Sequence, residues 1–305
     1  MRALLVTNPV ATSTREGTLD VIANALGSHV DLEVAITERR GHAVELAGRA
    51  RADGLDLVLA FGGDGTVNEL VNGLLGADDS PDSPAPALAA LPGGSTNVFA
   101  RALGVPGDPV QATSALLAAL RQNRRRRVSL GRADGRWFTF AAGVGLDAEV
   151  VQRVEQRRRE GATSRPSLYV HTTTRTISRR HPVPEMVVDI SGAEPLRARM
   201  VIFGNTRPWT YLNSRPLDPF PEASFDGDLE LFALPKVGLV SVGTTLLRLL
   251  AGLPPGRRTS TCVHGVAKAM VSAEEPFPVE VDGEALSPRT SLVVEAVPRA
   301  LEVLG

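Results

Sequence analysis

The chain of 305 residues contains one cysteine, few aromatic residues (4%) and no long apolar run. A single cysteine, Cys262, cannot form an internal disulfide and provides no zinc-site spacing, so we expect a small buried apolar residue in a reducing compartment. Apolar runs such as residues 57–61 and 200–203 are far shorter than the roughly 20 residues that cross a bilayer. Because the first residues also lead directly into a strand-like run, we expect a cytoplasmic protein without a signal peptide or membrane span.

The chain also has almost no net charge. The 33 basic and 34 acidic side chains leave a formal charge of -1, which gives no reason to expect nucleic-acid binding. The basic residues are nearly all arginine, and they gather in residues 124–127 and 153–165. A solvated helix face is the ordinary explanation of such runs. Contact with anionic lipid headgroups or nucleotide phosphates is the functional alternative.

The order of apolar patterns predicts two domains. Up to residue 91, short β-type runs alternate with helical ones, which predicts an α/β N-terminal domain with a parallel sheet. After residue 123, strand signals follow one another at 186–190, 197–203, 229–234, 263–271 and 291–297. Such a succession predicts a C-terminal antiparallel β-sandwich or barrel, interrupted by a helix at 237–250. We expect the domains to be residues 1–126 and 127–305, with the last residues able to pack back on the first domain.

A glycine-rich motif follows a fully apolar strand and opens a helix. Glycines let the backbone approach a phosphate closely, and the helix N-terminus directs amide donors at the anion. An aspartate in the middle would repel a phosphate, so its carboxylate suits a magnesium ion or a hydroxyl proton. The alternative is that it only caps a helix beginning near Thr66. The motif consists of Gly62, Gly63, Asp64, Gly65, Thr66, Val67, Asn68 and Glu69.

A second loop of the same kind follows the next strand. It runs Pro92, Gly93, Gly94, Ser95, Thr96 and Asn97. Two such loops on neighbouring strands could hold successive phosphates of one nucleotide. Neither loop has the lysine of a P-loop or the glycine spacing of the dinucleotide fingerprint. The nucleotide must therefore be held in another way.

Together with five further motifs, the two loops resemble the diacylglycerol kinase catalytic superfamily, which includes soluble bacterial lipid kinases and sphingosine kinases. The motifs follow the family order over almost the whole chain, although the 62–66 element is shared with NAD kinases and phosphofructokinases. The five are Asn8-Pro9, Thr37 with residues 41–43, the stretch 143–149, the stretch 226–229 and the stretch 281–284.

The resemblance implies a nucleotide-binding α/β domain (NAD kinase/diacylglycerol kinase-like) followed by a β-rich lipid-substrate domain. It further implies a lipid kinase that uses ATP and Mg²⁺ to phosphorylate a lipid hydroxyl, most simply diacylglycerol to phosphatidic acid. By position, the residues that contact ATP would be Asn8, Thr37, Gly62, Gly63, Asp64, Gly65, Thr66, Asn68, Glu69, Gly94, Ser95 and Asn97.

The resemblance also implies the remaining site residues. Soluble bacterial members give the proton-acceptor role to the glutamate at Glu284, whereas sphingosine kinases give it to the aspartate at Asp64, and both stay candidates. Secondary magnesium ligands would be the carboxylate of Asp226 and the carbonyls of Ala223 and Asp228. The resemblance places lipid-headgroup contacts at Glu149 and Arg165, across a segment whose length differs from that of the family. The alternatives are an exposed helix position for Glu149 and a surface arginine for Arg165.

Other readings of the sequence remain open. A sphingoid base or another lipid could be the substrate, NAD kinase is a second kinase reading, and a catalytically silent lipid- or nucleotide-binding protein is a third. The usual glycines after Asn-Pro are replaced by residues 10–14, which puts ATP affinity there in doubt. As partners we expect ATP, a membrane lipid, peripheral contact with the anionic inner membrane face and a homodimer, but no nucleic acid.

Overall fold

The computed structural model describes residues 1–9, 17–76, 84–160, 166–178, 183–212 and 215–305, without the side chains of residues 158–159, 166–170 and 178. The chain divides into two compact units. The first comprises residues 1–130, 135–139 and 298–305, and the second comprises residues 131–134 and 140–297. The chain therefore passes into the second unit and returns to the first before its end.

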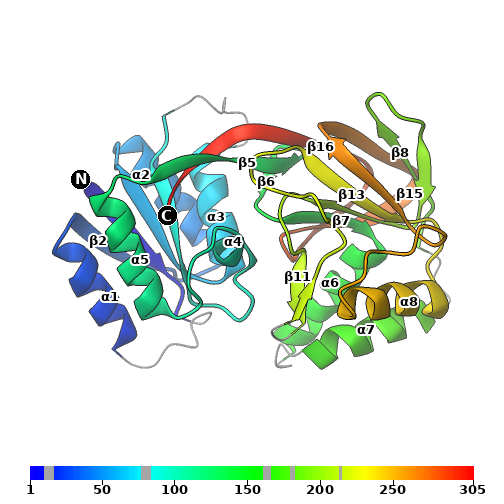
Figure 1. The fold of residues 1–305 in the computed structure, drawn as a ribbon, viewed down its shortest axis with the longest axis horizontal. Coiled ribbons are helices and arrows are strands. Elements are labelled where there is room, and N and C mark those ends of the chain that lie inside the picture. Colours follow the sequence, from blue (N-terminus) through cyan, green and yellow to red (C-terminus); the bar gives the residue numbers. More distant parts are fainter. Residues whose placement is uncertain (10–16, 77–83, 161–165, 179–182, 213–214) are drawn as a thin grey trace. The chain divides into compact units, whose positions relative to one another are not determined.

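The first unit is a parallel sheet with helices, as the sequence predicts (Figure 1). The strands of its parallel sheet include β1 (Arg2–Thr7), β2 (Asp31–Ile36), β3 (Leu57–Gly62) and β4 (Ala87–Pro92). Its helices are α1 (Thr18–Gly27), α2 (His42–Ala52), α3 (Asp64–Leu75), α4 (Val98–Ala102) and α5 (Pro109–Arg121). The strands lie in the order β2, β1, β3, β4, all parallel.

Burial explains why this sheet is parallel. Every residue of β3 and of β4 is buried, which is typical of strands covered on both faces. On one face, Leu5, Leu59 and Phe61 pack with Ile22 of α1 and Leu116 of α5 in a single core. Helix α5 begins where the sequence predicts no element: the Asp108 carboxylate accepts hydrogen bonds from two amides of the first turn, and proline follows at the next position.

The second unit is antiparallel and β-rich, with three helices among its described residues. Its strands include β7 (Ala141–Gly145), β8 (Met186–Ile190), β9 (Leu196–Ala198), β10 (Met200–Gly204), β11 (Thr210–Leu212), β12 (Arg215–Leu217), β13 (Leu229–Leu234), β14 (Thr261–Val266), β15 (Lys268–Val281) and most of β16 (Glu284–Leu304). Its helices are α6 (Leu146–Arg159), α7 (Pro166–Ser178) and α8 (Leu239–Leu250). The main strand order is β14, β13, β10, β7, β15, β16.

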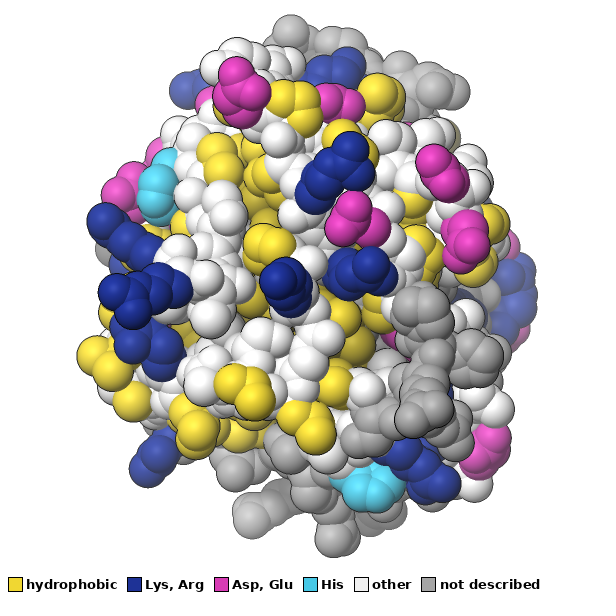
Figure 2. All heavy atoms as spheres, turned by 90° about the vertical axis from the view of Figure 1, so that its right-hand side faces the viewer, with side chains coloured by type: hydrophobic (Ala, Val, Ile, Leu, Met, Phe, Trp, Pro, Cys, Tyr) yellow, Lys and Arg dark blue, Asp and Glu magenta, His cyan; other side chains and the backbone are white. Residues whose placement is uncertain are grey.

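Helices α6 and α8 share a small apolar core in this unit. Leu146, Val150 and Val154 of α6 are buried, and Val242 of α8 packs against that cluster. Some apolar side chains of the unit stay at the surface, where Figure 2 shows them beside lysine and arginine side chains.

Two Asp-Gly pairs form hairpin turns. Asp134 and Gly135, with φ values of 44° and 84°, connect β5 (Arg125–Ala133) to β6 (Arg136–Phe138). Asp282 and Gly283, with φ values of 48° and 79°, connect β15 to β16. Positive φ at both central residues is the signature of the type I′ turn that the sequence predicts for the first pair.

Two expectations about exposure and secondary structure are wrong. Cys262 is exposed, because β14 is an edge strand of its sheet and most of its residues are exposed. Most of the arginine run 124–127 lies in β5, not on a helix.

Among the helices in the described ranges, none is both long and apolar enough to cross a membrane.

Candidate active site

The two glycine-rich loops lie side by side at the carboxyl ends of β3 and β4. Gly62 and Pro92 are in register at the strand ends, and the Gly93 amide donates to the Gly62 carbonyl at 2.9 Å. A Cβ atom on Gly94 would come within 2.6 Å of the Gly63 Cα atom. The backbones approach so closely at Gly94 that a side chain does not fit there, and the contact lies at the start of α3.

Asp64 is the first residue of α3 and is half-buried. Its Oδ1 atom accepts a hydrogen bond from the Phe99 amide at 3.1 Å. The expectation of a helix beginning near Thr66 is wrong, because α3 begins two residues earlier with Gly63 at its N-cap and no side-chain cap. Asp64 therefore connects the starts of α3 and α4 instead of capping its own helix.

Asn97 fixes the shape of the second loop. It adopts a left-handed conformation with φ of 49°. Its Oδ1 atom accepts from the Gly94 amide at 2.9 Å, and its Nδ2 atom donates to the Gly94 carbonyl at 2.7 Å. Ser95, between them, is exposed. The loop thus holds Gly94 rigidly and presents a serine hydroxyl to solvent.

The same edge of the sheet collects the other predicted nucleotide residues of the N-terminal strands. Asn8 follows β1 and Thr37 follows β2, and the Thr37 amide donates to the Thr7 carbonyl at 2.9 Å. Ligands of open parallel sheets bind beyond the carboxyl ends of the strands. The altered residues 10–14 lie outside the described residues.

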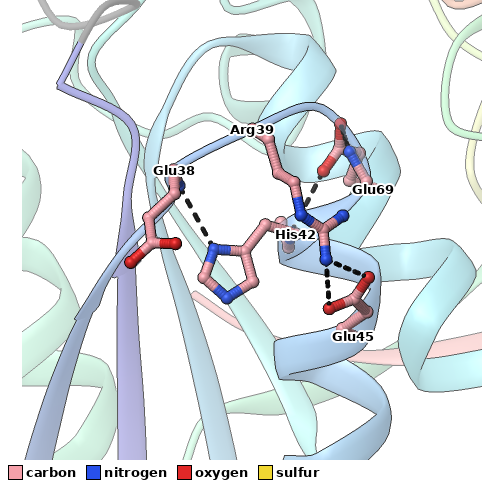
Figure 3. Close-up of polar contacts among 7 residues, drawn as sticks. Glu38, Arg39, His42, Glu45 and Glu69 are labelled. Carbon is pink, nitrogen blue, oxygen red and sulfur yellow. Dashed lines mark hydrogen bonds and ion pairs between the residues drawn. The ribbon is translucent and has the colours of Figure 1, made fainter.

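Glu69 lies one turn into α3 and reaches the start of α2 (Figure 3). Its carboxylate accepts hydrogen bonds from the Gly41 amide at 2.9 Å and from the Ala43 amide at 3.2 Å. Nearby, His42 accepts from the Glu38 amide at 3.2 Å through Nδ1. A carboxylate at a helix N-terminus stabilises the helix. Glu69 therefore has a structural use, and its predicted contact with ATP stays a prediction.

Asn68 is completely buried. Its Nδ2 atom donates to the Trp137 carbonyl at 3.0 Å, and its Oδ1 atom accepts from the Arg136 guanidinium at 2.9 Å. The side chain attaches β6 to α3 within the first unit. Of its neighbours in the motif, Thr66 is buried and Gly65 is half-buried.

In the second unit, Glu284 is the first residue of β16 and is half-buried. It follows the turn formed by Asp282 and Gly283. Asp282 is 5% exposed, and its Oδ1 atom accepts from the amides of Phe140 and Ala141 at 3.0 and 3.1 Å. Two hydrogen bonds to a buried carboxylate give this turn a defined position. They therefore also fix where Glu284 begins its strand.

A buried carboxyl pair adjoins this turn, and the sequence did not reveal it. Asp147 lies in the first turn of α6 and Glu280 lies in β15, and both buried carboxyl groups lie beside the Cβ position of Gly143. Burial raises the pKa of Asp147 to about 7. Burial and then the neighbouring Asp147 raise the pKa of Glu280 well above its usual range. Burial and a neighbouring carboxyl both disfavour the charged form of an acid, so this pair favours a protonated group.

The surroundings of this pair include one backbone amide and explain one glycine. The Gly283 amide donates to Glu280 Oε2 at 2.7 Å. On β7, a Cβ atom at Gly143 would collide with both carboxyl groups. Asp147 stands in the predicted motif 143–149, but only the folded chain brings Glu280 beside it.

Oxygen donors are present at the predicted magnesium loop of the second unit. Asp226 and Asp228 are exposed and Ala223 is buried. Carboxylates and backbone carbonyls are the donors that Mg²⁺ prefers, so the chemistry of the set fits this ion. The loop is closed by a hydrogen bond from the Gly227 amide to the Ser224 carbonyl at 3.3 Å.

A second set of metal-type donors brackets this loop. Ligand atoms of Glu222, Glu230 and His264 lie within 4.8 Å of one another. His264 Nδ1 is 3.1 Å from a Glu230 carboxylate oxygen, and burial raises the pKa of Glu230 while His264 opposes the rise. The sequence gave no sign of this set, because His264 comes from a distant strand.

Of the two residues predicted to contact a lipid headgroup, one is described by the structure. Glu149 is half-buried on α6 and pairs with Arg153 one turn later, so it is not the fully exposed helix position of the alternative. Arg165 lies outside the described residues.

Comparison with known proteins supports the resemblance. Residues 2–133 match the family model of the diacylglycerol kinase catalytic domain. A diacylglycerol kinase of Bacillus subtilis is 33% identical over 161 residues, which cover 51% of this chain and 50% of that protein. A probable lipid kinase, YegS-like, of Chromohalobacter salexigens is 39% identical over 119 residues, or 39% of this chain and 36% of that protein. The chain thus matches about half the length of these relatives or less.

Solved structures match over nearly the full length. A diacylglycerol kinase structure from Bacillus anthracis has a TM-score of 0.71 at 23% identity, covering 99% of this chain and 96% of that one. An NAD kinase from Archaeoglobus fulgidus, in complex with ATP, has a TM-score of 0.56 at 13% identity, covering 100% and 94%. The fold is therefore of the NAD kinase/diacylglycerol kinase type, and the predicted fold class is confirmed.

Proposed function

Residues 2–133 match the diacylglycerol kinase catalytic domain, and on that premise we propose that the chain is an ATP- and Mg²⁺-dependent lipid kinase. The γ-phosphate would pass to a lipid hydroxyl, with diacylglycerol, converted to phosphatidic acid, as the first substrate. The observation that carries the proposal is the close approach of Gly63 and Gly94 at the start of α3, beside Asp64.

The first unit would bind ATP through its backbone. The amides at the start of α3 and of the second loop supply donors for phosphate oxygens, and Ser95 supplies a hydroxyl. Asn8 and Thr37 follow the neighbouring strands at the same edge. Glycine at 94 is needed because a Cβ atom there would collide with the Gly63 backbone and separate the two loops. The β-rich second unit would hold the lipid.

Phosphoryl transfer requires in-line positioning, charge neutralisation and an acceptor for the hydroxyl proton. Magnesium would supply the charge neutralisation. Glu284 is our first candidate for the proton acceptor, since the turn before it is fixed by the buried Asp282 carboxylate. Asp64 is the second candidate. At the secondary magnesium loop, Ala223, Asp226 and Asp228 would hold the ion.

The test is magnesium-dependent transfer of labelled phosphate from ATP into diacylglycerol, a monoacylglycerol and a sphingoid base. Asp64→Asn and Glu284→Gln are compared with two matched variants at exposed acids, Asp20→Asn on α1 and Glu275→Gln on β15. We expect a phosphorylated lipid from the native chain and from both matched variants only. Tight nucleotide or lipid binding without product from any lipid would replace this proposal with a silent binding protein.

A lipid kinase has to reach a substrate that lies in a bilayer. We propose peripheral attachment at the cytoplasmic face as part of the same function. Arginines near the start of the second unit were the candidates from sequence, and Arg157 lies on α6 within reach of His171. The side chains of residues 158 and 159 are not among those described.

A further inference from the structure

Helix α8 exposes apolar side chains on its outer face. Leu239, Val240 and Leu247 are 57%, 79% and 68% exposed, and Leu253, just after the helix, is 49% exposed. Single exposed apolar residues are common, but a group on one helix face is not. Figure 2 shows hydrophobic side chains gathered beside lysine and arginine side chains on this side of the second unit.

The inner face of the same helix is already used. Thr245 and Leu249 are buried, and Val242 packs against the core of α6. The helical period places Leu239, Val240 and Leu247 together on the opposite side. A surface helix ordinarily carries charged residues there. Helix α8 has one charged residue, Arg248, which donates to the Pro254 carbonyl at 2.9 Å.

The sequence segment that carries this face has charges of one sign only. Residues 231–273 include no aspartate or glutamate, although the chain as a whole has slightly more acidic than basic residues. Gly256 lies beside the Arg248 side chain, so the chain folds back at the end of α8 just before two exposed arginines. The basic residues of the segment are Lys236, Arg248, Arg257, Arg258 and Lys268.

We propose that the outer face of α8, together with Leu253, docks on an anionic lipid bilayer. The proposal rests on the lipid-kinase function and assigns its membrane contact to a surface other than the arginine run of α6. An apolar helix face with cationic residues at its ends is suited to lie in the interface of a bilayer, where the apolar side chains enter the acyl boundary and the cations meet the headgroups.

A second copy of the chain fits this face less well. In a two-fold symmetric contact, antiparallel α8 helices would bring Lys236 of one copy towards Arg257 and Arg258 of the other. Like charges brought together across an interface disfavour association. Anionic headgroups would instead complement the charge at both ends of the helix.

The test is cosedimentation with vesicles of phosphatidylcholine alone or mixed equally with phosphatidylglycerol. We compare the native chain with a variant carrying Leu239→Ser, Val240→Ser and Leu247→Ser, and with a matched variant carrying Val21→Ser and Val110→Ser at exposed sites of the first unit. All these positions are exposed, so circular dichroism should be unchanged. We expect the α8 variant to lose at least about tenfold in partitioning to the mixed vesicles, and the matched variant to bind like the native chain.

A second variant separates charge from apolar contact. Combined Lys236→Ser, Arg257→Ser and Arg258→Ser should weaken binding to the mixed vesicles and remove most of its salt dependence. Unchanged vesicle binding of the apolar α8 variant would overturn the proposal, as would absence of binding by the native chain. A change from dimer to monomer in that variant, with vesicle binding intact, would assign the face to a second copy.

Activity on dispersed substrate distinguishes this proposal from the lipid-kinase function. The apolar α8 variant should phosphorylate a short-chain diacylglycerol in detergent micelles at the native rate and lose activity on vesicles. If the native chain phosphorylates no lipid in either form, the proposed function fails, while the vesicle-binding comparison still decides the role of α8.

Discussion

The Asp64 carboxylate accepts a hydrogen bond from the Phe99 amide at 3.1 Å, and this bond connects the first residue of α3 to the first turn of α4. Each helix follows one of the two glycine-rich loops. The bond therefore holds both loops in one arrangement before any ligand arrives. Preorganisation of this kind is what phosphoryl transfer demands of a protein, because little covalent chemistry is left to its side chains.

Gly94→Ala should separate the two loops. The added Cβ atom would lie 2.6 Å from the Gly63 Cα atom, so the backbone must move, at a cost of about 1 to 3 kcal/mol. We expect ATP affinity, measured by calorimetry, to fall at least about tenfold. Gly107→Ala is the matched change, since nothing lies within 4 Å of its Cβ position. Native affinity in Gly94→Ala would contradict a role for this close approach.

Asp147→Asn should flatten the pH dependence of stability. Burial raises the pKa of Asp147 from 3.8 to about 7, and the Glu280 pKa rises too. Between about pH 4 and 7, the folded state therefore binds more protons than the unfolded state. The free energy of unfolding falls as pH rises through this range. The slope is at most about 1.4 kcal/mol per pH unit for each group.

Denaturant unfolding at several pH values measures this slope. Asp147→Asn removes one titrating group, and the slope should become smaller than in the native chain. Asp20→Asn at an exposed site should keep the native slope. If both variants had the native slope, the carboxyl pair would not be the source of the pH dependence.

Glu69→Ala should destabilise the first unit. The change removes two hydrogen bonds from the Gly41 and Ala43 amides at the start of α2, and we expect a loss of about 1 to 2 kcal/mol. Glu69→Gln retains an acceptor and should lose less. Thermal unfolding gives the comparison, with Glu45→Ala as the control for an exposed glutamate of α2 that pairs with Arg39. Equal losses at 69 and 45 would contradict the capping role.

Asp226→Asn should remove stabilisation by magnesium. An ion that binds only the folded chain raises the melting temperature with its concentration, and we expect this rise in the native chain. In Asp226→Asn the rise should be lost, and in Glu194→Gln, at an exposed site, it should persist. If Glu222→Gln lost the rise in melting temperature with magnesium while Asp226→Asn kept it, the ion would lie at Glu222, Glu230 and His264 instead.

Local patterns were sufficient for much of the fold and for part of the candidate site. The glycine loops were predictable because a buried strand, a turn and a helix start follow one another within a few residues, as at 57–69. The Asp134-Gly135 turn was predictable for the same reason. Helix α7 was missed, because an arginine-rich stretch precedes it without a clear cap signal.

Contacts between distant segments could not be predicted in this way. Asp147 and Glu280 meet only because β7 and β15 are paired, and no spacing in the sequence encodes that pairing. The hydrogen bonds of Asn68 with Arg136 and Trp137 also join segments that are distant in the sequence. The sequence predicted the helix that is α8 but not which of its apolar side chains are exposed. Exposure depends on which other segments of the chain pack against the helix.

The central claim is that the chain transfers phosphate from ATP to a lipid hydroxyl at a site that includes Asp64. The most direct measurement is the rate of labelled phosphatidic acid formation from diacylglycerol micelles by the native chain and by Asp64→Asn, both confirmed to be folded. We predict product from the native chain and a loss of at least about a hundredfold in the variant. Equal rates in the two chains would contradict the assigned site, and no product from the native chain would contradict the claim itself.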